Sequence, residues 1–496
     1  MFAKNTFWNL VYQLTAVVAG FLVPRAIIGV YGSEVNGLVT SLTQFIGYFA
    51  LVEAGISGAA TFALYKPLAQ GDWKGVNVVA SASRAFYQKS GAVFLALLVG
   101  LSVVYPVFVS AGALSPWEIV ALTFLLGAKV VVDFFSLSKY RVFLTADKRN
   151  WLIQLASTVY TLLNTAIIIA FSHLHVHVVS VYALSLAAVF ARSAILAVYT
   201  RRRYPQLDCK ADYGDYELPQ RWDALFLQIL GAVQSGAPVI LATVLCGSMS
   251  DVSVLAVYLL VSNGLQMIPN VLGTGLQALF GRQIADGDYA TLRSSYRPYR
   301  ALVYSVSAVA CGCAFSLILP FVDLYAGGFR DADYHNAFLG FLVVLNVFLY
   351  HGKSSQGLLV IAAGMYRETR WQTCIQALII VALGIPLTAE FGVVGTIAAS
   401  CVSNAYRVVD LLLFEPTRIS GDTVSSSLAA FGLYVLQTAL VALPGYLLAR
   451  LACTWALWTA VAAVLVLWGV AVVCLTLLLL DKNSFRSIFK RFVRNG

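Results

Sequence analysis

The chain carries about fourteen apolar stretches, each near the length that an α-helix needs to cross a bilayer. The hydrocarbon core is about 30 Å thick, so a spanning helix needs about 20 mostly apolar residues. The stretches are continuously apolar rather than alternating, which favours helices over a β-barrel. We therefore expect an all-α polytopic membrane protein with spans near 7–30, 36–64, 84–109, 116–139, 151–171, 176–199, 223–247, 251–280, 300–322, 335–362, 371–390, 391–413, 425–449 and 454–480.

Composition agrees with a lipid-facing surface. Of the 496 residues, 60% are hydrophobic and only 11% are charged, whereas about a quarter of the residues of a soluble domain are charged. The net charge of +10 does not indicate a nucleic-acid partner, because the basic residues cluster in short loops between apolar spans. The eight cysteines are scattered without the paired spacing of a zinc site. We expect no nucleic acid, no metal and no cofactor.

The loops alternate in charge along the chain. With the N-terminus inside, 27 Lys and Arg residues fall in one set of loops and only Arg330 and Arg450 in the other. Arg141, Arg300 and Arg407 are counted in the basic set. Positively charged loops stay in the cytoplasm, so both termini are expected there. Residues 66–83 are expected to form a basic interfacial segment.

The chain also repeats itself at an offset of about 215 residues. The spacing of Trp8 and Pro24 returns in Trp222 and Pro238, and the loop before Trp73 resembles the loop before Tyr289. Six spans per repeat place the repeats in parallel, as in alternating-access transporters. We expect an N-terminal six-helix lobe over 1–205, a C-terminal six-helix lobe over 206–420, and an additional two-helix unit with a basic cytoplasmic tail over 421–496.

The first 90 residues contain a recognisable set of short motifs. They include Pro24-Arg25, Asn36-Gly37-Leu38, Glu53-Ala54-Gly55 and Leu64-Tyr65-Lys66-Pro67-Leu68-Ala69. In these motifs the chain resembles the Wzx-type polysaccharide-biosynthesis flippases of the multidrug/oligosaccharidyl-lipid/polysaccharide exporter superfamily. The resemblance implies a bacterial inner-membrane flippase that moves an undecaprenyl-diphosphate-linked oligosaccharide to the outer leaflet for surface polysaccharide synthesis. It also implies a twelve-helix core of two bundles facing a central cavity.

The expected partners follow from this activity. They are the lipid-linked oligosaccharide, membrane lipids and glycan-assembly proteins. No ATPase element is present in the sequence, so we expect coupling to a gradient of H⁺ or Na⁺. Some relatives, including the peptidoglycan lipid flippases, share the additional helix pair.

Six charged residues fall inside the predicted spans. A charge at that depth costs several kcal/mol unless it is paired or hydrated, so each is a functional candidate. Cations in a hydrated cavity would stabilise a diphosphate during its passage. The predicted cavity cations are Arg25, Lys129, Arg192 and Lys353, and the predicted ion-coupling or structural partners are Glu53 and Asp133.

Each of these residues also has a simpler interpretation. Lys129 and Asp133 are four residues apart and can neutralise each other on one helix face. Arg25 and Arg192 can extend to an interface. Glu53 can serve as the structural partner of a basic residue.

Two other functions are compatible with many spans. A drug or organic-cation antiporter of the same superfamily would have mostly acidic residues in its cavity, whereas cations predominate here. A membrane-embedded polymerase or glycosyltransferase needs a large outer loop with clustered carboxylates. The only acidic cluster in the outer loops is Asp323, Asp331 and Asp333. We therefore expect no catalytic residues and no enzyme.

Overall fold

The structure is a computed structural model that describes residues 2–53, 56–109, 112–214, 216, 222–273 and 275–487, and these residues form helices without any strand. Fourteen helical segments are long and apolar enough to cross a membrane, which confirms the predicted all-α, fourteen-span architecture. Each predicted stretch overlaps one of them. They are Lys4–Tyr31, Ser33–Gln70, Trp73–Phe108, Pro116–Ser136, Asn150–His173, Val178–Arg203, Gln228–Leu245, Met249–Gly273, Tyr289–Ala326, Ala337–Ala363, Arg370–Phe391, Val393–Ser420, Val424–Leu451 and Trp455–Leu480.

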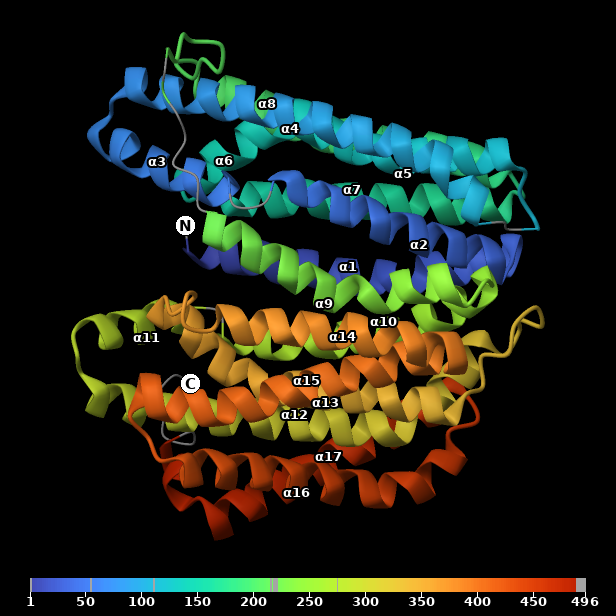
Figure 1. The fold of residues 1–496 in the computed structure, drawn as a ribbon, viewed down its shortest axis with the longest axis vertical. Helices are drawn as coiled ribbons and strands as arrows, with labels where there is room; N and C mark the ends of the chain where they lie inside the picture. The colour runs from blue at the N-terminus through green and yellow to red at the C-terminus, as the bar shows by residue number, and fades with distance from the viewer. Residues whose placement is uncertain are drawn as a thin grey trace. The chain divides into compact units, whose positions relative to one another are not determined.

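The chain divides into two compact units, Met1–Ser253 and Val254–Gly496 (Figure 1). The lobe boundaries expected from the repeat, 1–205, 206–420 and 421–496, stay a prediction. Three basic residues of the expected C-terminal tail, Lys490, Arg491 and Arg494, lie outside the described residues.

Unit 1 is built from helices that pack against one another in pairs. In its core, α1 packs on α7, α7 on α8, α5 on α8, and α4 on α5. The elements are α1 (Phe2–Tyr31), α2 (Ser33–Phe49), the 3₁₀ turn η1 (Ala50–Glu53), α3 (Ile56–Gln70), α4 (Trp73–Phe108), α5 (Pro116–Val132), the π-helical turn η2 (Asp133–Leu137), α6 (Ser138–Ala146), α7 (Asn150–His173), α8 (Val178–Arg203) and α9 (Trp222–Leu245).

Unit 2 repeats this packing. Contacts of α12 with α13, α13 with α15 and α14 with α15 correspond to those of α4, α5, α7 and α8 in unit 1, and α16 and α17 pack on α12 as an additional pair. The elements are α10 (Met249–Gly273, which begins in unit 1), α11 (Leu276–Ala285), α12 (Tyr289–Ala326), α13 (Ala337–Ala363), α14 (Arg370–Phe391), α15 (Val393–Glu415), η3 (Pro416–Ser420), α16 (Val424–Leu448), η4 (Ala449–Leu451) and α17 (Trp455–Leu480).

The same two-residue turn begins the long helix of each unit. Gly71 and Gly287 have φ of 68° and 71°, a conformation that glycine adopts without a Cβ penalty. The following Asp72 and Asp288 cap α4 and α12 by accepting a backbone hydrogen bond of 3.0 Å each. These helices of 36 and 38 residues are about 54 and 57 Å long at 1.5 Å per residue. The turn shows the internal repeat in three dimensions.

Some sequence-based positions need correction. Residues 66–83 are the end of α3, a short turn and the first turns of α4, and their position at the membrane interface stays a prediction. Arg141, Arg300 and Arg407 are not loop residues, because they lie within α6, α12 and α15. Apolar runs alone do not show where such a helix ends, because a helix can continue through charged residues that form ion pairs.

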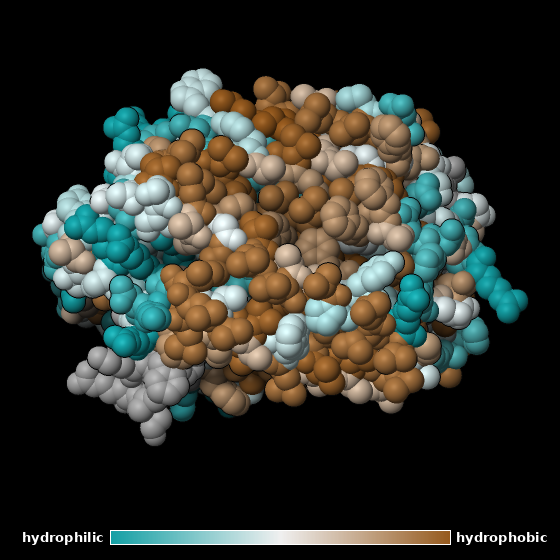
Figure 2. Space-filling view, turned by 90° about the horizontal axis from the view of Figure 1, so that it is seen from below, coloured by the Kyte–Doolittle hydropathy of each residue, from teal (hydrophilic) through white to brown (hydrophobic). Residues whose placement is uncertain are grey.

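The surface is that of a protein surrounded by lipid. On the face shown in Figure 2, hydrophobic residues form a broad band, and hydrophilic residues gather toward its ends. Large apolar side chains on the additional helices remain exposed, including Leu443 on α16 at 74% and Leu467 on α17 at 71%. Such exposure is stable in hydrocarbon rather than in water.

Candidate functional site: charged groups within the spans

An ion pair lies inside unit 1. Asp133 begins the π-helical turn η2, a type of irregularity that is frequent at functional sites, and its carboxylate pairs with the guanidinium of Arg192 on α8. The same guanidinium lies 4.6 Å from the ring centre of Tyr160 on α7. Arg192 is therefore held among three helical elements instead of extending to an interface.

Lys129 does not pair with Asp133, the partner that the four-residue spacing suggests. Its ammonium donates a 3.0 Å hydrogen bond to Oδ1 of Asn164 on α7 and lies 5.4 Å from the ring centre of Tyr182 on α8. Asp133, four residues later, is engaged by Arg192. Among the described residues, no carboxylate forms an ion pair with Lys129. The predicted cation thus points into unit 1 and is held there by neutral groups.

Glu53 and Arg25 are the two remaining predicted site residues of unit 1. Glu53 ends η1 and accepts a 2.8 Å hydrogen bond from Arg141 on α6, so the connection between α2 and α3 is tied to α6. The next two residues of its motif, Ala54 and Gly55, lie outside the described residues. Arg25 follows Pro24 in α1, and its side chain is exposed.

Two cations, Lys353 and Arg407, lie within the spans of unit 2, and Arg407 forms an ion pair. Lys353 on α13 is half-buried, with its ammonium 5.6 Å from the ring centre of Tyr350. The helix α13 packs against α15, which carries Arg407. Arg407 is only 7% exposed and forms a 2.5 Å ion pair with Asp410, one turn later on the same helix. Two positive charges and one negative charge therefore share this part of unit 2.

A chain of amides connects the helices beside these charges. Asn404 on α15 donates to Asn346 on α13 at 2.7 Å and accepts from Gln376 on α14 at 3.2 Å. Asn404 and Arg407 are three residues apart and so lie on one helix face. Sequence reasoning missed Asn346, Asn404 and Arg407 as site residues. For Asn404 and Arg407, the available signal in the sequence was a helical pattern that continues through polar residues between 393 and 415.

An amphipathic cavity of about 680 Å³ lies between α12, α16 and α17. One wall carries Arg293, Arg297 and Arg300, and another carries apolar residues such as Leu433 and Leu436. Arg297 binds the carboxylate of Asp422 through two hydrogen bonds of 2.6 and 3.0 Å. The additional helix pair therefore borders a space that combines cationic and apolar surface.

Comparison with known proteins identifies the fold. No family model matches the chain, and no curated protein matches its sequence. Among solved structures, it is similar to an inward-facing multidrug resistance MATE family transporter of the MOP superfamily, with a TM-score of 0.62, 15% identity, and coverage of 84% of this chain and 95% of that one. It is also similar to the lipid II flippase MurJ in an inward closed conformation, with a TM-score of 0.61, 11% identity, and coverage of 98% and 99%. At these identities, the likeness concerns the fold.

Proposed function

We propose that this chain is a MOP-superfamily flippase that moves an undecaprenyl-diphosphate-linked oligosaccharide from the cytoplasmic to the outer leaflet by alternating access. The observation that carries the proposal is the imbalance of charge within the spans. Asp133 is neutralised by Arg192 and Asp410 by Arg407, whereas Lys129 and Lys353 have no carboxylate partner among the described residues.

A lysine within a span that has no carboxylate partner favours an anionic cargo. A diphosphate brings negative charge into a region of low dielectric, where a nearby ammonium interacts with it far more strongly than in water. An organic-cation antiporter would need the opposite, which is free carboxylates at this depth. In this chain Asp133 and Asp410 pair with arginines, and the buried Glu415 lies 3.9 Å from Arg300.

Two further observations support a lipid cargo. The cavity beside α16 and α17 is lined by Arg293, which has no carboxylate partner among the described residues, and by apolar side chains such as Leu433, which suits an anionic lipid. The likeness to the lipid II flippase covers 98% of this chain, whereas the likeness to the multidrug transporter covers 84%. The drug antiporter remains the second candidate because it has the same fold.

The proposal includes the placement and partners of the protein. Both termini would lie in the cytoplasm of a bacterium, with the chain in its inner membrane. Lobes 1–205 and 206–420 would alternate in access, and the unit 421–496 would accompany them. Arg25 and Arg192 would join Lys129 and Lys353 as substrate-binding cations, H⁺ or Na⁺ would drive transport, and glycan-assembly proteins would supply and receive the cargo.

A reconstituted assay tests the cargo directly. Proteoliposomes would contain a fluorescent undecaprenyl-diphosphate oligosaccharide, and a membrane-impermeant quencher would report its leaflet. Wild type is compared with Lys129→Gln, Lys353→Gln and the control Lys74→Gln, which changes an exposed lysine at the start of α4. Loss of one charge-assisted contact is worth about 1.5–3 kcal/mol, or about ten- to a hundredfold in binding.

The outcomes separate the two candidates. Transport by wild type and the control, with loss in both span variants, supports the flippase. Equal transport in all four proteins rejects the role of the two lysines. Export of a cationic dye by wild type, with no movement of the lipid, selects the antiporter instead.

A further inference from the structure

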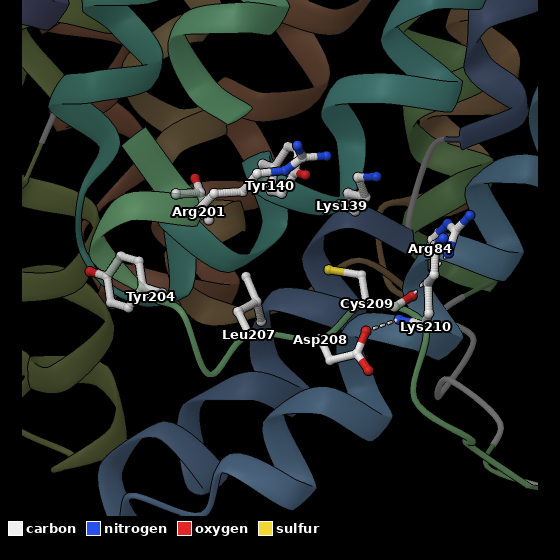
Figure 3. A pocket seen from close by; sticks show the side chains of 10 residues that line it. Arg84, Lys139, Tyr140, Arg201, Tyr204, Leu207, Asp208, Cys209 and Lys210 are labelled. Carbon is white, nitrogen blue, oxygen red and sulfur yellow. Dashed lines mark hydrogen bonds between the residues drawn. The ribbon is translucent and has the colours of Figure 1, made fainter. Parts of the chain in front are cut away.

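A second group of cations lies at one end of unit 1, apart from the charged groups described above. A cavity of about 160 Å³ is bordered there by α4, α6, the end of α8 and the loop 204–210 (Figure 3). Four cations and one acid line it, namely Arg84, Lys139, Arg201, Lys210 and Asp208.

The charge around this cavity is strongly positive. Its one carboxylate is already engaged, because Asp208 accepts a 2.8 Å hydrogen bond from the backbone N–H of Lys210 (Figure 3). Like charges that share a small space raise the local potential and favour entry of an anion. The lining therefore selects for a negatively charged occupant.

Contacts within the protein hold the loop that borders this cavity. Asn77 on α4 fixes the loop through two 3.0 Å hydrogen bonds, one to the carbonyl of Gln206 and one from the N–H of Asp208. The ring of Tyr204 packs edge-on against Phe143, with the centres 4.9 Å apart. A site of this kind loses little conformational entropy on binding.

Two buried donors on the cavity wall lack acceptors. Nε of Arg84 and the hydroxyl of Thr200 have no hydrogen-bond partner among the described residues, and Thr200 is only 1% exposed. A buried donor without a partner costs about 1–3 kcal/mol. An occupant with several acceptor oxygens would remove that cost.

We propose that this cavity binds a phosphate group, either free in solution or in the headgroup of an anionic lipid. A phosphate offers negative charge to the surrounding cations and acceptor oxygens to Nε of Arg84 and the hydroxyl of Thr200, and guanidinium groups bind it with paired hydrogen bonds. The volume is well above the ~10–15 Å³ that holds one water molecule. The site is independent of the transported cargo.

The chain contains a reporter for occupancy. Cys209 lines the cavity and is half-buried, and burial raises the pKa of its thiol against the opposing effect of Lys139 and Arg84. An anion in the cavity would cover this thiol and slow its reaction with N-ethylmaleimide. The exposed Cys453, in the turn before α17, serves as an internal reference in the same molecule.

The test follows the rate of Cys209 labelling in the full-length protein by peptide mass spectrometry. In the first arm, detergent-solubilised protein is titrated with sodium phosphate or pyrophosphate at constant ionic strength. In the second arm, nanodiscs of phosphatidylcholine are compared with nanodiscs that also contain phosphatidylglycerol. The variants are Lys139→Gln and Arg201→Gln, and the matched control is Arg202→Gln, a neighbouring exposed arginine that does not line the cavity.

Protection of Cys209 but not Cys453 in either arm supports the site, and the arm in which it occurs identifies the source of the phosphate. Removing one charged contact should weaken the protection about tenfold in Lys139→Gln and Arg201→Gln while Arg202→Gln behaves as wild type. Absence of protection in both arms overturns the proposal. Equal weakening in Arg201→Gln and Arg202→Gln also overturns it, because that result indicates general attraction to a basic surface.

Discussion

Arg192 and Arg407 occupy the same position in two equivalent helices, each fourteen residues after the first residue of α8 (178 to 192) and α15 (393 to 407). Arg192 pairs with Asp133 of a neighbouring element. Arg407 pairs with Asp410 within its own helix. The repeat thus keeps an arginine at this position, and its carboxylate partner comes from a neighbouring element in unit 1 and from the same helix in unit 2.

Removing one partner of the Asp133–Arg192 ion pair should lower stability more than removing both. We expect Asp133→Leu to lower the stability of the protein by about 1–3 kcal/mol, because it leaves the guanidinium of Arg192 without its carboxylate at a partly exposed site. The double variant Asp133→Leu with Arg192→Leu should recover most of this loss. Thermal unfolding of the purified protein measures both. A double variant less stable than either single one would contradict this account.

Removing the charge of Lys353 should separate stability from transport. We expect Lys353→Met to raise the melting temperature, because burial disfavours an ammonium that has no carboxylate partner among the described residues, and to abolish movement of an anionic lipid. Thermal unfolding and the leaflet assay supply the two readouts. A melting temperature of Lys353→Met below that of wild type would show that the unpaired charge does not lower stability.

The turn between α14 and α15 should tolerate no side chain at Gly395. A Cβ there would lie 1.9 Å from the carbonyl oxygen of Leu387, so the two helices must separate. We expect Gly395→Ala to destabilise the protein by about 1–3 kcal/mol, the usual cost of overpacking.

A matched control for this substitution exists in the neighbouring helix. At Gly357 in α13, a Cβ would meet nothing within 4 Å. Gly357→Ala should therefore be neutral or stabilise the helix by about 0.5–1 kcal/mol. Equal melting temperatures for the two alanine variants would argue against close packing at Gly395.

The turn before α16 should lose stability in acid. Burial disfavours ionisation of Asp422, but hydrogen bonds from Arg297 and from the N–H of Thr423 outweigh it and hold the pKa of this carboxyl below its ordinary value of 3.8. A group whose pKa is lowered on folding stabilises the folded state above its unfolded pKa, and this stabilisation is lost as pH falls through the folded pKa.

Comparison with Asp422→Asn isolates this contribution. The difference in unfolding free energy between wild type and the variant should stay constant above about pH 5 and shrink below about pH 4. Denaturation followed from pH 7 to pH 3 in the same detergent measures it. A difference that grows as the pH falls would have the wrong sign for this interaction.

The sequence by itself determined which segments cross the membrane. A span must be about 20 residues long and apolar, and its backbone must be hydrogen-bonded internally, so local composition was sufficient to find all fourteen spans. The repeat was also visible, because the turns before α4 and α12 need glycine and aspartate at fixed places. The depth of Lys129 and Lys353 followed from the same pattern.

Only the tertiary structure decided which charges are cancelled. Asp133 lies four residues from Lys129, yet it pairs with Arg192, 59 residues away, while Lys129 binds Asn164, 35 residues away. The sequence pattern places Arg407 in a loop, whereas α15 continues through Arg407 and its partner Asp410. Hydrophobicity is a property of each segment, but the partner of a charge depends on which helices pack together and on how each is rotated about its axis.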